Sequence, residues 1–222
     1  MAKPYSIIIP IFNEKLKIPS LLEFTKEYSC LGHEILIVND GSNDGSKEIL
    51  SKCNFIKLIN FKKNKGKGEA LKRGLTLAKN NKIIIFDGDL ELDPNDIRKL
   101  MILDKNKSVN SVFANRFGKS QPKSIWNLGN WLFTLFFNLL YNVKIKDALC
   151  CAKAFFKNDL NLDNIKSKKF NIDIELTSKL IKLYPDVKNI NIQYNRRNIS
   201  QGKKLRFKDS LSILITMIQN RV

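Results

Sequence analysis

The chain has 222 residues, 43% of them hydrophobic and 14 of them phenylalanine, a composition that excludes an intrinsically disordered protein. This length suits one sizeable α/β domain and is too short for two, so we expect a single domain spanning 1–222. The formal net charge of +18 predicts an anionic partner, namely nucleic acid, an anionic membrane surface or a phosphorylated substrate. A generally lysine-rich composition is the alternative that needs no partner.

The first half of the chain alternates between apolar runs and helical patterns. The predicted elements are a strand, a helix, a strand, a polar turn and a helix, at 5–14, 18–29, 34–40, 41–46 and 47–52. Pro10 removes one ladder donor, so the end of the first strand is expected to bend or to lie at an edge of the sheet. This order is typical of a doubly wound parallel sheet, and neither a P-loop nor a G-x-G-x-x-G pattern is present.

A basic, glycine-containing turn at 62–68 separates a third predicted strand, 55–60, from a helix at 69–79. Backbone N–H groups at a helix N-terminus bind anions, and the lysines would add to that attraction. The same turn is equally well interpreted as a solvated run of charges. Both interpretations stay open at this point.

The most informative stretch is 82–94. Its apolar run 83–86 predicts a buried strand, which is followed at once by Asp87, Asp89 and Glu91. Carboxylates two residues apart in an extended chain point the same way, so they can bind one hard divalent cation. A solvated acidic turn before a helix capped near Asp93 is the alternative.

The second half begins with a predicted helix at 95–104 and a strand at 108–115 that ends at Arg116. Segment 124–142 is apolar on all sides yet too short to span a bilayer, so it is either a buried helix or one at a membrane interface; the net charge favours the interface. The remaining predictions are a return to the core, a helix, a strand, a basic stretch and a C-terminal helix, at 147–156, 170–181, 188–194, 195–206 and 209–218.

The compartment is suggested by the cysteines and by the start of the chain. Cys30, Cys53, Cys150 and Cys151 form no C-x-x-C pair, which argues against a zinc site or a disulfide framework. No signal peptide precedes the first strand, and no apolar run approaches the ~18 residues of a spanning helix. We therefore expect a cytoplasmic protein that associates with a membrane peripherally, or through a membrane-protein partner.

Taken together and in order, several segments resemble a family 2 glycosyltransferase of the GT-A fold, in the branch of dolichyl-phosphate mannose synthase and polyprenyl-phosphate sugar transferases. The matching segments are 8–14, 38–46, 64–68, 87–94, 115–117, 147–155, 170–175, 194–197 and 202–204. The resemblance implies a Rossmann-like, mostly parallel central sheet with helices on both faces and a C-terminal amphipathic helix. It further implies a nucleotide-sugar-binding half, 1–118, and an acceptor-binding half, 119–222.

The resemblance also implies roles for single residues. Nucleotide-sugar binding falls to Pro10, Phe12, Glu14, Asp40, Asp87 and Gly88, with Asp40 accepting a hydrogen bond from the base. Mg²⁺ or Mn²⁺ would be held by Asp87, Asp89 and Glu91. The catalytic set is Asp89, Arg116, Arg197 and Lys203, with Arg196 and Lys204 beside the acceptor phosphate. This chain has Glu91 where the synthases often have Gln, and Asn39 where an Asp is usual.

The implied reaction is an inverting, metal-dependent transfer of a hexose, mannose or glucose, from a nucleotide sugar to a polyprenyl phosphate. Such an acceptor oxygen is already ionised, so no catalytic base is needed, and His33, the only histidine, is interpreted as a surface residue. A saccharide hydroxyl is the alternative acceptor, and it would require a base. A nucleic-acid binder is the remote alternative, but the aromatics gather in one apolar helix rather than along a basic stripe, so we expect no nucleic-acid partner.

Overall fold

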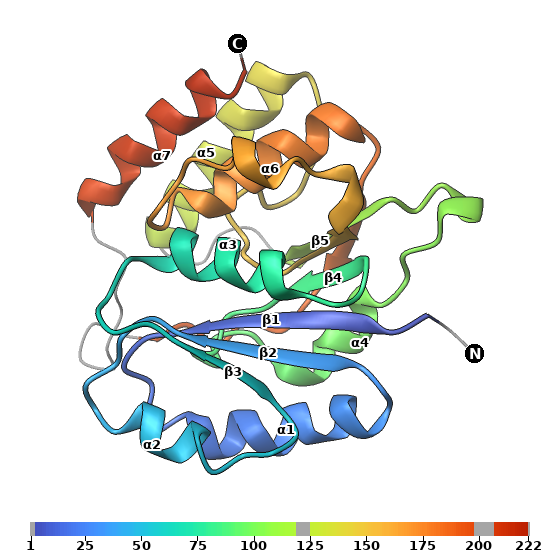
Figure 1. Cartoon of the computed structure of the whole chain (residues 1–222). Helices are drawn as coiled ribbons and strands as arrows, with labels where there is room; N and C mark the ends of the chain where they lie inside the picture. Colours follow the sequence, from blue (N-terminus) through green and yellow to red (C-terminus); the bar gives the residue numbers. More distant parts are fainter. Residues whose placement is uncertain (1–2, 119–124, 198–206, 222) are drawn as a thin grey trace.

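A computed structural model describes residues 3–118, 125–197 and 207–221, and it is built around a mixed seven-stranded sheet (Figure 1). The strands are β1 (Tyr5–Ile11), β2 (Glu34–Asn39), β3 (Lys57–Asn60), β4 (Lys82–Ile85), β5 (Ser111–Asn115), β6 (Lys153–Phe156) and β7 (Lys188–Asn191). Their order is β3-β2-β1-β4-β6-β5-β7. Only β6 runs against its neighbours, so the expectation of a mostly parallel sheet is confirmed.

Helices cover both faces of this sheet, as predicted. They are α1 (Ile18–Cys30), α2 (Ser46–Leu50), α3 (Lys67–Leu77), α4 (Ile97–Leu100), α5 (Ile125–Tyr141), α6 (Ile172–Leu183) and α7 (Phe207–Gln219). In Figure 1, α1, α2 and α4 lie on one side, and α3, α5, α6 and α7 on the other. The carboxyl ends of β1, β2 and β4 therefore meet at one edge between the two layers, where open α/β sheets bind ligands.

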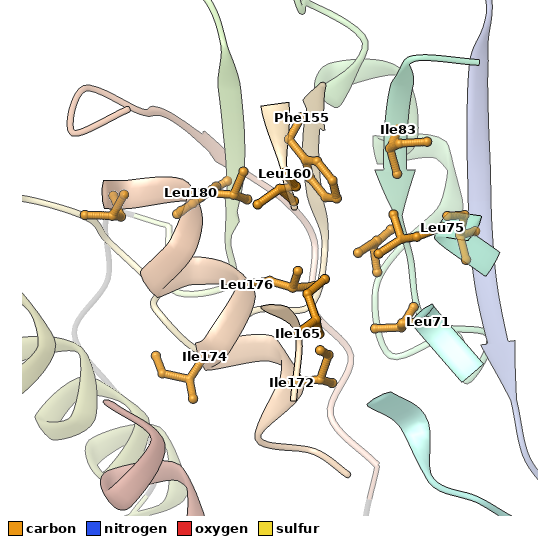
Figure 2. Packing of buried hydrophobic residues seen from close by; sticks show 14 of the residues in the cluster. Leu71, Leu75, Ile83, Phe155, Leu160, Ile165, Ile172, Ile174, Leu176 and Leu180 are labelled. Carbon is orange, nitrogen blue, oxygen red and sulfur yellow. The ribbon is translucent and has the colours of Figure 1, made fainter. Parts of the chain in front are cut away.

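Each face of the sheet has its own hydrophobic core, because successive strand residues point to opposite sides. Ile8, Ile83 and Ile85 face the α3 side, where they belong to the same cluster as Leu71 and Leu75. Figure 2 shows how this cluster continues through Phe155 of β6 to the apolar face of α6. The alternate residues of β1 and β4 enter the second core, beneath α1 and α4. The buried strands therefore read as unbroken apolar runs rather than as alternating patterns.

The bend or edge position predicted for the end of the first strand is found in part: β1 is paired on both sides, but its pairing with β4 ends before Pro10, and the chain bends at Phe12 and Asn13. The carbonyl of Ile8 accepts from Phe86 N, so the backbone of Ile8, and of Pro10 two residues later, points toward β4. Pairing with β4 ends at Ile8, whereas Pro10 still lies opposite Val38 of β2. The missing N–H thus falls where no partner is needed, and proline is tolerated in an interior strand.

The predicted helix at 95–104 is wrong in extent. It begins as a 3₁₀ turn, Pro94–Asp96, in which Asp93 accepts from Asn95 N at 2.9 Å, and α4 ends at Leu100. Beyond it the backbone N–H of Leu103 donates to the hydroxyl of Tyr5 at 3.0 Å. A tertiary contact has replaced the helical hydrogen bond there. The other predicted strands and helices are present, with ends shifted by a few residues.

Helix α5 is buried on one face and exposed on the other, so it is not a wholly buried helix, and its predicted place at a membrane interface stays a prediction. Phe137 and Tyr141 are buried and stacked, with ring centroids 4.2 Å apart. Other large apolar side chains of α5 and of the neighbouring α7 are exposed, namely Leu128, Trp131, Leu132, Leu135, Phe136, Leu139, Leu211, Ile215 and Ile218. The hydroxyl of Tyr141 in α5 donates to the Met217 carbonyl of α7, and Nε of Arg221, just after α7, donates to the Leu140 carbonyl of α5. These two hydrogen bonds join the helices. Within the described ranges, no helix has both the length and the apolar character needed to cross a bilayer.

Candidate active site

The loops that leave β1 and β2 hold each other by hydrogen bonds. Asn13 N donates to the hydroxyl of Ser42 at 2.9 Å, and Asn43 N donates to the side-chain oxygen of Asn13 at 3.0 Å. Glu14 N donates to the hydroxyl of Ser46 at 3.2 Å, and the Glu14 side chain is buried. Short polar side chains of this kind satisfy loop backbone and fix its conformation. Glu14 is thereby held at the carboxyl edge of the sheet.

Asp40 organises the basic turn predicted to bind an anion. Its two carboxylate oxygens accept from Lys65 N at 2.7 Å and from Gly66 N at 2.8 Å. Burial raises the pKa of Asp40, and these two amide hydrogen bonds act against that rise. Both oxygens are thus engaged with the backbone, and two of the amides expected to bind an anion already face a carboxylate. The predicted contact of Asp40 with a nucleotide base stays a prediction.

Lys67, the first residue of α3, lies between two carboxylates. Its ammonium is 2.9 Å from an oxygen of Asp87, at the end of β4, and 2.8 Å from an oxygen of Asp173, in the first turn of α6. Burial disfavours the charged lysine, but the attraction of Asp173 and Asp87 outweighs it and raises the Lys67 pKa well above its usual value. Burial would raise the pKa of Asp87, but the attraction of Lys67, together with hydrogen bonds from Cys151 and Lys67, outweighs burial and lowers that pKa. Asp87 is therefore an ionised carboxylate.

Arg197 lies inside a group of three carboxylates. The chain after β7 runs antiparallel to the loop after β4: Asp93 N donates to the Gln193 carbonyl at 3.2 Å, and Asn195 N donates to the Glu91 carbonyl at 2.7 Å. Leu92 and Tyr194 form a bridge between the two segments. This pairing carries Arg197, from far along the chain, to the predicted metal ligands.

The contacts of Arg197 are close. Its guanidinium is 2.9 Å from Glu14 and 2.8 Å from Asp89, and Nε lies 3.6 Å from Glu91. The backbone N–H of Arg197 also donates to Glu91 Oε1 at 3.1 Å. Burial, together with the negative charge of nearby Asp87, raises the pKa of Asp89 to about 6 although Arg197 acts in the opposite direction. Among the described contacts, three carboxylates meet this one guanidinium.

The ligand chemistry of this group fits a hard divalent cation. Carboxylate oxygens are what Mg²⁺ and Mn²⁺ prefer, and Glu14, Asp89 and Glu91 already surround one cationic group. In the described part of the chain, however, no three Asp, Glu, His or Cys side chains are arranged to hold a metal ion. Lys67 draws Asp87 to one side while Arg197 draws Asp89 and Glu91 to the other, so the three predicted ligands do not converge.

Arg116 is held by Asp147 in an internal ion pair. Arg116 Nε and Nη2 donate to the two oxygens of Asp147 at 2.7 and 2.9 Å, and the Asp147 side chain has no exposure. The guanidinium also lies over the ring of Tyr194, 5.5 Å from its centroid. Burial acts against the charge, but the attraction of Asp147 outweighs it and raises the Arg116 pKa well above its usual value. Arg116 is fixed in place by these contacts.

The other predicted residues are placed as follows. Gly88 is buried, and a Cβ there would lie 2.8 Å from Cγ1 of Ile11, so the turn after β4 requires glycine. Pro10 and Phe12 are half-buried at the end of β1. Lys203 and Lys204 lie outside the described residues.

Sequence reasoning missed the partners of the charged groups. The sequence pattern places Lys67 only in the basic turn 62–68, and Asp147 and Asp173 only in the matching segments 147–155 and 170–175. Each acidic partner comes from an element distant in the chain. Only an alternation of basic and acidic residues at strand ends and helix starts could have indicated such pairs.

Comparison with solved structures identifies the fold. The chain is similar to glucosyl-3-phosphoglycerate synthase of Mycobacterium tuberculosis in complex with UDP, with a TM-score of 0.75 over 99% of this chain and 80% of that chain, at 16% identity. A complex of the same enzyme with Mn²⁺, UDP and glucosyl-3-phosphoglycerate gives a TM-score of 0.74 over 98% of this chain, also at 16% identity. The predicted GT-A-like fold is confirmed.

Sequence relatives extend the comparison. An uncharacterised protein of Methanocaldococcus jannaschii is 29% identical over 87% of this chain and 90% of its own length. A dolichyl-phosphate beta-glucosyltransferase of Trichomonas vaginalis is 25% identical over 96% of this chain and 72% of that protein. An undecaprenyl-phosphate 4-deoxy-4-formamido-L-arabinose transferase of Pseudomonas savastanoi pv. phaseolicola is 37% identical, but the match covers 50% of this chain and 36% of that protein.

The family follows from residues 6–161, which match the sequence model of glycosyl transferase family 2. This match covers more than half of the chain. That stretch runs from the second residue of β1 to beyond β6 and contains every site residue from Glu14 to Asp147. The chain belongs to glycosyl transferase family 2.

Proposed function

We propose that the protein transfers a hexose, mannose or glucose, from a nucleotide diphosphate sugar to a polyprenyl phosphate, with inversion at the sugar carbon. The observation that carries this proposal is the pairing of opposite charges at one edge of the sheet. Glu14, Asp89 and Glu91 meet Arg197 there, within one compact group. Two relatives whose names specify dolichyl-phosphate or undecaprenyl-phosphate acceptors support the choice of a lipid phosphate.

The donor side of the proposed site comprises Pro10, Phe12, Glu14, Asp40, Asp87 and Gly88. Mg²⁺ or Mn²⁺, held by Asp89 and Glu91 with Asp87 beside them, would neutralise the leaving nucleoside diphosphate. Asp89 is for this reason the side chain on which catalysis depends most. Since Asp87 is ionised and Asp89 has a raised pKa, the two carboxylates are not equivalent.

The acceptor side is assigned to Arg116, Arg197 and Lys203. A guanidinium offers a planar pair of donors to a phosphate, which suits an acceptor of this kind. The nucleophile is the phosphate oxygen itself, so the reaction needs no protein base. His33 agrees with this, because its Nδ1 accepts from Tyr5 N at 3.2 Å, at the beginning of β1 rather than at its carboxyl end.

The exposed apolar side chains of α5 and α7 are proposed to meet the membrane that holds the lipid acceptor. Trp131 and Leu139 belong to this surface, at 44% and 74% exposure. Aromatic and aliphatic residues of a helix lying in an interface bury their apolar face among lipids. The positive net charge favours an anionic leaflet on the cytoplasmic side, and a membrane-protein partner is the second means of attachment.

The test is a panel of radiolabelled donors, GDP-mannose and UDP-glucose among them, offered with a short polyprenyl phosphate and Mn²⁺. We expect one donor to give a charged lipid-linked product that partitions into organic solvent. Omission of the lipid phosphate is the control. Transfer to a saccharide hydroxyl with no lipid-linked product would overturn the acceptor assignment and favour the alternative acceptor.

The role of Arg197 is tested by its replacement with alanine. We expect KM for the lipid phosphate to rise more than KM for the nucleotide sugar, because Arg197 is assigned to the acceptor. Equal increases in both constants would argue against that assignment.

A further inference from the structure

Lys67 connects the two halves of the protein at the site. Its side chain is only 9% exposed and contacts Asp87, which follows β4 of the first half, and Asp173, in α6 of the second half. These contacts are 2.9 and 2.8 Å long. An ammonium group this well enclosed is held by its partners rather than by solvent. The three side chains therefore behave as one unit.

The backbone of Lys67 is fixed as firmly as its side chain. Gly66 N donates to Asp40, and Gly68 N donates to the carbonyl of Lys168 at 2.9 Å. A Cβ on Gly68 would lie 2.1 Å from the carbonyl oxygen of Ser167, so this approach requires glycine. The start of α3 therefore packs between Asp40, which follows β2, and segment 166–169 of the second half.

Segment 166–169 is itself anchored to α6. The carboxylate of Glu175 accepts from Lys166 N at 2.9 Å and from Ser167 N at 2.7 Å. Glu175 is buried and lies on the same helix as Asp173. Helix α6 therefore supports Lys67 twice, through Asp173 at the ammonium and through Glu175 at the adjoining backbone.

The charges explain what Lys67 does for Asp87. Asp87 and Asp173 flank the same ammonium, and without it two poorly solvated carboxylates would repel each other. Asp87 would then turn toward solvent. With Lys67 present, the carboxylate is held at one place on the floor of the site, beside the buried turn at Gly88.

We propose that Lys67 is a positioning residue that orients the Asp87 carboxylate for the nucleotide, and that Asp173 is its anchor in α6. The inference rests on the proposed function, because Asp87 is assigned there to the donor. It goes beyond that function in making nucleotide binding depend on a helix of the acceptor half. Neither Lys67 nor Asp173 need touch the substrate for this to hold.

The experiment compares Lys67→Met with the double variant Lys67→Met/Asp173→Asn in the full chain. The readouts are the thermal unfolding midpoint and the dissociation constants of UDP and GDP in the presence of Mn²⁺, by titration calorimetry. Lys105→Met is the matched control, because it removes a 2.8 Å ion pair with Asp159 at the opposite edge of the sheet.

We expect Lys67→Met to unfold at a lower temperature, since it leaves two carboxylates unpaired. The double variant should regain most of that stability, because one carboxylate is removed together with the cation. Its nucleotide affinity should stay roughly tenfold or more below wild type, as for other residues that orient a ligand group. Lys105→Met should bind nucleotide as the wild type does.

Nucleotide affinity equal to wild type in a folded double variant would overturn the inference, because Lys67 would then only balance charge. The two proposals fail separately. A wild-type protein that binds nucleotide but transfers no sugar, with weakened binding in the double variant, overturns the proposed function and supports the inference. No nucleotide binding by the wild type overturns both.

Discussion

The two arginines of the site are surrounded very differently. Arg116 is paired with one carboxylate, that of Asp147, through two hydrogen bonds. Arg197 contacts three, those of Glu14, Asp89 and Glu91. Among the charged side chains in these contacts, the first group is neutral and the second carries a net charge of −2. Both guanidinium groups are largely buried, at 14% and 11% side-chain exposure.

The difference separates a cation that contacts one carboxylate from a cation that contacts three. A buried ion pair whose charges balance does not attract a further ion, and removing one of its partners strongly destabilises the fold. A group in which carboxylates outnumber cations attracts a further cation. The pKa of Asp89 is raised mainly by burial and next by the charge of Asp87, with a smaller contribution from Glu91. A divalent cation proposed at Asp89 and Glu91 would therefore compete with Arg197 for their oxygens. Arg116, proposed for the acceptor phosphate, would face it from a position fixed by Asp147.

The largest effect is expected from Asp89→Ala, which removes one of the surplus carboxylates. Sugar transfer should fall by about 10³-fold, because a preorganised electrostatic group is lost from the transition state. Turnover under saturating donor measures this, with circular dichroism to show that the variant is folded. Asp163→Ala, at an exposed position, is the control. Retention of full turnover would remove Asp89 from the metal and catalytic assignments.

Next in size is Arg116→Met, which leaves the buried Asp147 without its cation. The free energy of unfolding should fall by about 3 kcal/mol, as measured by urea denaturation. Arg98→Met is the matched control, because Arg98 pairs with Glu27 at the surface with 58% and 51% side-chain exposure, and its loss should cost under about 1 kcal/mol. Equal losses for the two variants would contradict the structural role of Arg116.

The turn that carries Lys67 should be sensitive to a single methyl group. Gly66 has φ of +97°, and a Cβ there would lie 2.3 Å from the Lys168 carbonyl oxygen, so Gly66→Ala should cost about 2 kcal/mol of unfolding free energy. Gly129→Ala in α5 is the opposite case, with open space around its Cβ, and should raise stability by up to about 1 kcal/mol. Destabilisation by both would show that a general loss of fit, not the left-handed turn, is responsible.

The smallest effect tests whether Arg197 and a divalent cation compete for the same carboxylate oxygens. Arg197→Ala removes the group that competes for the oxygens of Asp89 and Glu91, so Mn²⁺ should bind about tenfold more tightly, a change of about 1.4 kcal/mol. Mn²⁺ binding followed by electron paramagnetic resonance measures this without any turnover. Arg98→Ala controls for the loss of one positive charge elsewhere. Weaker Mn²⁺ binding in Arg197→Ala would show that the arginine supports the cation site rather than competing with it.

Much of the fold could be predicted from sequence because it depends on local pattern. The runs at 6–11, 35–38 and 83–86 are unbroken and apolar, and buried parallel strands require that pattern. The acids at 87–91 follow a strand directly, so their place at the carboxyl edge follows from connectivity. Helix 95–104 was overextended, because the hydroxyl of Tyr5 takes up a backbone N–H that the helix would have used.

The sequence by itself determined the family, the parallel sheet and the edge at which the charged residues gather. Only the tertiary structure decided which charges meet. Arg197 reaches Asp89 because the segment after β7 pairs with the loop after β4, and Asp173 reaches Lys67 because α6 packs against the same core as α3. Ion pairing depends on distances of a few ångströms between groups far apart in the chain, and local sequence patterns do not encode such distances.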